Sequence, residues 1–221
     1  MLSFPIGIKA EVLEDGNGIL YSVKDGEVTV EGFNYAGNKM KVPEKIDGLP
    51  VRYIAPYACR GNTAITTVIL PSTIISVGDF AFAECPNLTK VEMKGGISIG
   101  RSAFRDCKAL LKVTLPSTLE SIDDFAFDSC VMLGKVKIPK GLKSIGVDAF
   151  AGCDRVRFEA GGNSYAKEYA ESYSIPTSFK DSWEYTLLLI AVTTALLTGA
   201  VLAGKRIIKK AKENKTRADE A

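Results

Sequence analysis

The chain has 221 residues, 46% of them hydrophobic, and a formal net charge of +2. This length allows one medium-sized domain with an appendage, and the small charge gives no reason to expect a nucleic-acid partner. The chain has no histidine, which excludes a Ser-His-Asp or Cys-His catalytic arrangement and removes the commonest general base.

Two segments near the N-terminus predict a β-hairpin. Residues 19–23 and 28–33 show alternating apolar positions and flank Lys24-Asp25-Gly26-Glu27. An Asp-Gly pair between such segments is a strong hairpin signal. We expect residues 1–45 to form a β cap, because the open end of a stacked fold exposes apolar core and an unpaired edge.

The following segment repeats itself at a fixed spacing. Alanine followed by a large or sulfur-containing residue recurs at intervals of 23, 22, 23 and 23 residues. The second residues of these pairs are Cys59, Phe82, Phe104, Phe127 and Phe150. Such a period is typical of a solenoid, in which each unit buries its apolar face against its neighbours.

Each unit predicts a short strand, a turn and one helical turn. A Val-x-Leu stretch followed by proline predicts a strand that ends where proline removes the hydrogen-bond donor. The Ile-Gly step before Ala-Phe predicts a turn or a second short strand. Phe and Cys then lie three residues apart, which predicts a single helical turn with both on one face. One unit departs, having Lys94-Gly95-Gly96 instead of the proline turn and one residue fewer.

The unit over residues 110–130, Leu-Leu-Lys-Val-Thr-Leu-Pro-Ser-Thr-Leu-Glu-Ser-Ile-Asp-Asp-Phe-Ala-Phe-Asp-Ser-Cys, resembles the BspA-like, or LRR_5-type, leucine-rich repeat of bacterial and protist surface proteins. The resemblance covers roughly residues 17–178. It implies a leucine-rich-repeat solenoid, which we place at residues 46–160, and adhesion or ligand binding at a cell surface.

The five cysteines are predicted to pack in the core. Four recur once per unit, and the fifth replaces the Phe of the first unit. Stacked coils would place successive Cα atoms roughly 5 Å apart, which permits disulfides, but parallel side-chain directions disfavour them. No metal site is expected, because no two cysteines lie near in sequence and histidine is absent. We expect no cofactor and no enzymatic activity.

The C-terminal part predicts a membrane anchor. Residues 161–184 are expected to form a cap, with a short helix over residues 164–173, and a stalk. Residues 185–204 lack charge, and a helix of that length spans about 30 Å, the thickness of a bilayer core. The tail over residues 205–221 is rich in lysine and arginine, so the positive-inside rule predicts a cytoplasmic tail and extracellular repeats.

Two questions about this anchor stay open. The N-terminus lacks the pattern of a signal peptide, so either a leader precedes it or the late segment directs insertion and leaves the repeats in the cytoplasm. Small residues at four-residue spacing, Ala195, Gly199 and Ala203, predict close helix approach and a weak homodimer, the alternative being a monomeric anchor.

Polar positions of the predicted strands form two columns on one face. Strand side chains alternate, so the residues before and after each strand valine both point away from the core. The candidate ligand-binding residues are Lys90, Lys112, Lys135, Lys137, Glu92 and Thr114. Stacked lysines repel one another unless they are screened or bound, which predicts an acidic glycan or protein partner. The alternative is that they only solubilise the sheet and discourage edge pairing.

Together these features predict a single-pass surface protein that presents the solenoid for adhesion or ligand binding. The alternative is a structural or scaffolding membrane protein that recruits partner proteins, with repeats not at the cell exterior.

Overall fold

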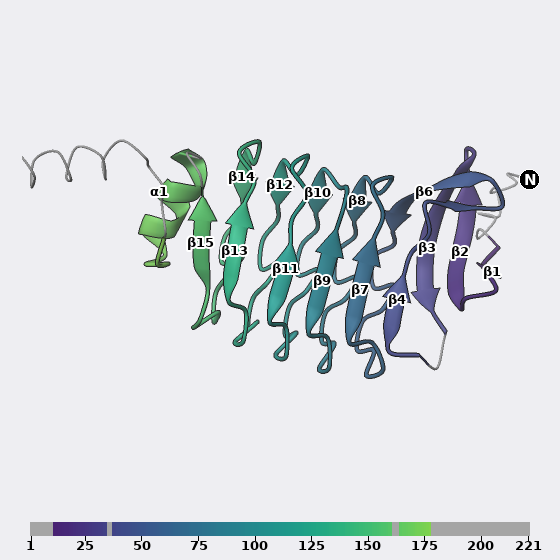
Figure 1. The fold of residues 1–221 in the computed structure, drawn as a ribbon, viewed down its shortest axis with the longest axis horizontal. Helices are drawn as coiled ribbons and strands as arrows, with labels where there is room; N and C mark the ends of the chain where they lie inside the picture. The colour runs from purple at the N-terminus through teal and green to yellow at the C-terminus, as the bar shows by residue number, and fades with distance from the viewer. Residues whose placement is uncertain (1–10, 35–36, 161–163, 178–221) are drawn as a thin grey trace, which may run out of the picture. The chain divides into compact units, whose positions relative to one another are not determined.

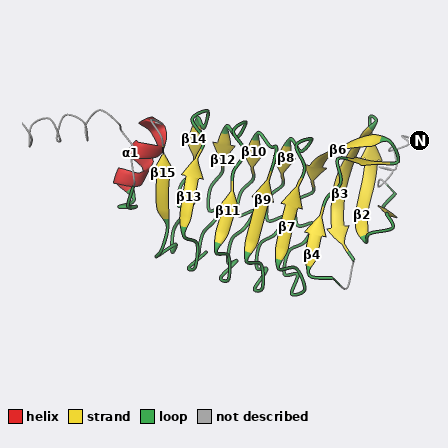
Figure 2. Ribbon diagram, viewed as in Figure 1, coloured by secondary structure: helices red, strands yellow, loops and turns green. Residues whose placement is uncertain are grey.

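The computed structural model describes residues 11–34, 37–160 and 164–177, which form a β-solenoid with two rows of strands (Figure 1). The long strands are β4 (Lys39–Lys41), β7 (Thr67–Leu70), β9 (Lys90–Met93), β11 (Lys112–Thr114), β13 (Lys135–Ile138) and β15 (Arg157–Ala160). The short strands are β8 (Ser76–Val77), β10 (Ser98–Ile99), β12 (Ser121–Ile122) and β14 (Ser144–Ile145). Each coil from β7 to β14 therefore has one strand in each row, as Figure 2 shows in yellow.

Neighbouring coils pair in parallel with equivalent positions opposite each other. Val68 lies opposite Val91, and Val113 lies opposite Val91 on its other side. The long strands form sheets in the order β11-β9-β7-β4 and β13-β15, and the short strands continue the larger sheet of the N-terminal hairpin. Because the same repeat position recurs at each step, apolar residues stack into continuous columns.

The predicted hairpin is confirmed. β2 (Ile19–Lys24) and β3 (Glu27–Phe33) pair antiparallel, and β1 (Leu13–Glu14) pairs with β2. Asp25 and Gly26 both have positive φ, which is the geometry of the tight turn that an Asp-Gly pair favours. β3 also pairs in parallel with β6 (Leu49–Ile54), which pairs in turn with β8 and, antiparallel, with β5 (Lys45–Ile46). The hairpin thus extends the short-strand row at its N-terminal end.

The long-strand row begins earlier in the sequence than we expected. β4 lies within residues 1–45, which the sequence analysis assigned to the cap, yet it pairs in parallel with β7. Met40 lies opposite Val68 and is fully buried, so it occupies the core position of the strand valine.

The expected helical turn of each unit is wrong, because the chain forms two successive tight turns there. In the coil of Phe82, Ala81 N–H donates to Gly78 O at 3.3 Å and Ala83 N–H donates to Phe80 O at 3.2 Å. Alternate residues instead bind the next coil, as Phe82 N–H donates to Ala103 O at 2.8 Å. A donor used between coils cannot serve an i to i−4 helical bond, so the three-residue spacing of Phe and Cys has a different origin.

That origin is a left-handed residue in each turn. Phe80 has φ of 55° and Glu84 has φ of 59°, and equivalent positions of the other coils show the same conformation, for example Phe125 at 56° and Ser129 at 60°. Left-handed residues reverse the chain within a few residues, which turns both Phe82 and Cys85 inward.

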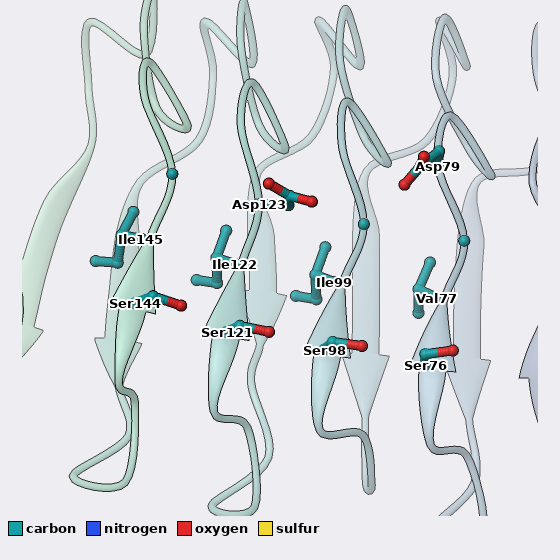
Figure 3. A pocket seen from close by; sticks show the side chains of 13 residues that line it. Ser76, Val77, Asp79, Ser98, Ile99, Ser121, Ile122, Asp123, Ser144 and Ile145 are labelled. Carbon is teal, nitrogen blue, oxygen red and sulfur yellow. The ribbon is translucent and has the colours of Figure 1, made fainter.

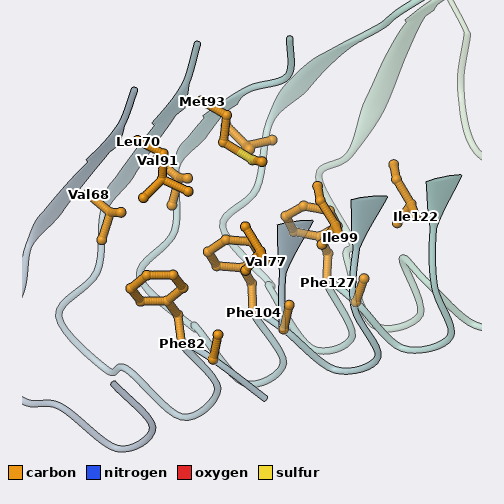
Figure 4. Packing of buried hydrophobic residues seen from close by; sticks show 14 of the residues in the cluster. Val68, Leu70, Val77, Phe82, Val91, Met93, Ile99, Phe104, Ile122 and Phe127 are labelled. Atoms are coloured by element: carbon orange, nitrogen blue, oxygen red, sulfur yellow. The ribbon is translucent and has the colours of Figure 1, made fainter. Parts of the chain in front are cut away.

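Phenylalanine and cysteine columns lie in the core, as predicted, and Figure 4 shows Phe82, Phe104 and Phe127 of the first column. The rings of Phe82, Phe104, Phe127 and Phe150 stack with neighbouring centroids 5.4, 5.3 and 5.1 Å apart. All five cysteines are buried and free. The thiols also act as donors, since Cys107 Sγ–H donates to Phe82 O at 3.1 Å. Equivalent bonds of 3.0 to 3.1 Å join Cys85, Cys130 and Cys153 to the preceding coil.

A short helix closes the last described coil. α1 (Ser164–Ser172) agrees with the helix expected over residues 164–173. It buries Ala166, Tyr169 and Ala170, and the Tyr169 ring stacks on Phe158 with centroids 6.3 Å apart. The Phe column therefore ends against aromatic residues of this helix, which shields it from water.

The predicted membrane segment at residues 185–204, with its Ala195, Gly199 and Ala203, lies outside the described residues, as does the tail at residues 205–221. Among the residues that the structure describes, no helix has the length and apolar character needed to cross a bilayer.

Candidate binding face on the long strands

The structure places all six candidate residues on the long-strand row. Lys90 lies opposite Lys112, and Glu92 lies opposite Thr114, in the pairing of β9 with β11. Within each strand the valine between the two candidates is buried. The expected alternation is therefore confirmed, and each pair of candidates flanks the core on the solvent side.

Both columns begin earlier in the chain than the sequence indicated. Lys39 lies opposite Thr67 and Lys41 opposite Ile69 in the pairing of β4 with β7. At the other end Arg157 lies opposite Lys135. The sequence analysis missed Lys39 and Lys41, although the order Lys-Met-Lys matches the order Lys-Val-Lys of β13.

Two of the lysines have acidic partners on the same face. Lys90 Nζ lies 3.1 Å from Glu92 Oε2, and Lys135 Nζ lies 3.4 Å from Glu159 Oε1. The Lys90 hydrogen bond lowers the pKa of Glu92, and the charges of Lys90, Lys94 and Lys39 act in the same direction. Nearby lysines are thus partly screened by the protein itself.

Lys112 and Lys137 differ from these two lysines, although Glu159 lies opposite Lys137 in the pairing of β13 with β15. Lys112 and Lys137 are exposed, and neither forms an ion pair with any residue in the described ranges. Thr114, which lies on β11 with Lys112, is exposed and adds no charge. The middle of the face therefore has an excess of positive charge, available to an acidic partner.

A groove follows the short strands, on a different part of the solenoid from the lysine columns (Figure 3). The hydroxyls of Ser76, Ser98, Ser121 and Ser144 form a row in register, beside a cavity of about 530 Å³. The row follows from the serine that precedes each Ile or Val of the short strands, a column that the sequence analysis did not use. The carboxylates of Asp79 and Asp123 line the groove beside this row, as Figure 3 shows.

The cysteines are unsuited to nucleophilic chemistry. Burial raises the pKa of the Cys59 thiol to about 12. The pKa of the Cys130 thiol is raised by its hydrogen bonding with Cys153 and by burial. Hydrogen bonding with Cys107 lowers the pKa of the Cys85 thiol. A nucleophilic cysteine also needs access to a substrate, however, and all five cysteine side chains are buried.

The stacked long and short strands place the chain in the class of solenoid repeat proteins. Residues 38–157 match the BspA type leucine rich repeat region in six copies, and the chain belongs to this family. The first copy begins just before β4, so the repeat recognised from five copies in the sequence has one more.

Solved structures agree with this assignment. A leucine-rich repeat protein from T. pallidum is 30% identical with a TM-score of 0.62, and the match covers 65% of this chain and 70% of that one. A leucine-rich repeat protein from Bacteroides ovatus is 28% identical with a TM-score of 0.54, and the match covers 64% of this chain and 39% of that one. No curated protein matches the chain.

Proposed function

We propose that this protein is a membrane-anchored surface protein that binds an acidic protein or glycan through its long-strand face. The observation that supports the proposal is the pair of columns in which Lys112 and Lys137 form no ion pair with any described residue. Membership of the BspA type repeat family is consistent with a binding role. Anchoring by residues 185–204, with extracellular repeats, is part of the proposal and rests on the sequence alone.

Binding to immobilised heparin and to polyglutamate at low salt tests the face. The triple variant Lys112→Gln/Lys135→Gln/Lys137→Gln is expected to bind at least one of them roughly tenfold more weakly, since each exposed charge contact is worth a few-fold in affinity. The matched control removes three lysines elsewhere, Lys24, Lys108 and Lys143. Unchanged affinity of the first variant for both polyanions would refute the proposed face.

Protease treatment of intact cells tests the location of the repeats. We expect digestion of the solenoid without opening the membrane. If the repeats survive until the membrane is permeabilised, the scaffolding alternative replaces adhesion, whatever the outcome of the polyanion experiment.

A further inference from the structure

The long-strand row has an open edge at β4. Thr67 N–H donates to Asn38 O at 3.2 Å and Val42 N–H donates to Ile69 O at 3.0 Å, so the main chain at positions 38 and 42 faces β7. Main-chain groups of successive strand residues point to opposite sides. Those of Lys39 and Lys41 therefore point away from β7, and they have no hydrogen-bond partner among the described residues.

The N-terminal hairpin does not cover this edge. β3 pairs with β6 in the short-strand row, and β4 is the terminal strand of its own sheet in the described part of the chain. An exposed edge of this kind can accept another strand, which gains main-chain hydrogen bonds by pairing with it.

A cleft of about 660 Å³ lies beside the open edge. The hairpin side contributes Asn17 and Phe33, and the solenoid contributes Ile69 and the buried Pro71. This volume is typical of ligand-binding clefts. The cleft reaches the free main-chain donors and acceptors of Lys39 and Lys41, and pairing with such groups is what binds an extended peptide in strand addition.

The charge of the cleft is positive. Lys39, Lys41 and Lys94 line it, with Glu44 as the one acidic residue among its lining side chains. Glu44 Oε1 already accepts a hydrogen bond from Ser72 Oγ at 3.2 Å. Pairing of two copies of this chain edge to edge would bring Lys39 and Lys41 against the same lysines, so the charges disfavour a second copy and favour an acidic partner.

We propose that an extended peptide segment with acidic side chains at alternate positions binds in this cleft as an added strand along β4. Its main chain pairs with Lys39 and Lys41, its acidic side chains lie on the same face as the two lysines, and its apolar side chains lie on the opposite face. This site goes beyond the proposed binding face, because it needs only β4 and the cleft.

Peptide analogues test strand pairing directly. The probe is a capped, dye-labelled hexapeptide in which glutamate and valine alternate, titrated with the full chain and followed by fluorescence anisotropy. One analogue is N-methylated at the glutamates and another at the valines. In a strand only one of these sets faces β4, so we expect one analogue to bind at least tenfold more weakly while the other binds like the parent peptide.

The weakened analogue also reports the direction of the added strand. Loss on methylation of the valines indicates parallel pairing, and loss on methylation of the glutamates indicates antiparallel pairing, because reversal of a strand exchanges the residues that face its neighbour. Equal affinities of the two analogues, or no binding of the parent peptide, would overturn the proposal.

Protein variants locate the site. The variant Lys39→Gln/Lys41→Gln is expected to bind the parent peptide about tenfold more weakly. The control Lys108→Gln/Lys143→Gln should bind it with unchanged affinity. An equal loss in Lys112→Gln/Lys137→Gln would assign the peptide to the whole basic face. That result would overturn the edge site and leave the proposed function standing. Unchanged polyanion binding by the variant of Lys112, Lys135 and Lys137 would refute the binding face and leave the edge site standing.

Discussion

The shortened coil at Lys94-Gly95-Gly96 depends on a glycine that approaches the preceding coil closely. A Cβ added to Gly95 would lie 2.2 Å from Ser72 O and 2.6 Å from Ser72 C, both of them main-chain atoms. Ordinary contacts require these atoms to separate by about 1 Å, and Lys94 N–H donates to Leu70 O at 3.1 Å in the same place. Gly95→Ala must therefore displace one coil from its neighbour.

The cost follows from two opposing effects. Overpacking of this kind costs about 1–3 kcal/mol, and replacing glycine by alanine recovers about 0.4–1 kcal/mol by restricting the unfolded chain. Gly134 supplies a matched control, because its added Cβ would lie 3.7 Å from the nearest atom, Leu111 O. We expect Gly95→Ala to lower the free energy of unfolding by about 1–2 kcal/mol and Gly134→Ala to raise it slightly.

Urea unfolding followed by circular dichroism measures this difference, and amide hydrogen exchange at Lys94 reports the local displacement. Faster exchange at Lys94 is expected in Gly95→Ala only. If Gly95→Ala proved as stable as Gly134→Ala, the close approach of the two coils would not restrict position 95 to glycine.

Two further predictions concern the core columns. Phe104→Ala removes a fully buried ring that stacks on both neighbours, so it should lower the free energy of unfolding by about 3–5 kcal/mol. The control Leu111→Ala, at an exposed position, should change it by less than about 0.5 kcal/mol. A loss below about 2 kcal/mol at Phe104 would contradict the tight packing of the ring. Cys59 keeps its proton in the folded state to about pH 12 but loses it near pH 9 when unfolded, so the unfolding free energy should fall as pH rises from 9 toward 12. In Cys59→Ala the unfolding free energy is expected to fall less steeply with pH, by up to about 1.4 kcal/mol per pH unit. Urea titrations at alkaline pH measure this slope, and equal slopes for the variant and the unmodified protein would show that burial does not hold this proton.

The strand columns could be predicted because their signal is periodic. Val68, Val91 and Val113 recur at one repeat position, and each is buried as expected. The first coil was missed because its strand has Met40 instead of valine, so that only the pairing of β4 with β7 reveals its phase.

The turn conformation could not be predicted from residue types. Phe80 and Phe125 adopt left-handed φ angles, a conformation that is rare for bulky aromatic residues. Hydrogen bonds to the next coil hold this backbone, as Phe80 N–H donates to Arg101 O at 2.9 Å. The partner lies 21 positions away in the chain, so no local pattern contains this information.

The solenoid, the hairpin, the core role of the cysteines and the two polar columns could all be predicted from the amino-acid sequence, because each follows from a fixed period of apolar residues or from local turn chemistry. The ion pairs of the lysines, the conformation of the turns and the open edge of β4 became visible in the folded chain. Those properties arise from contacts between coils and between the hairpin and the first coil. They depend on distances between residues far apart in sequence, which periodicity cannot supply.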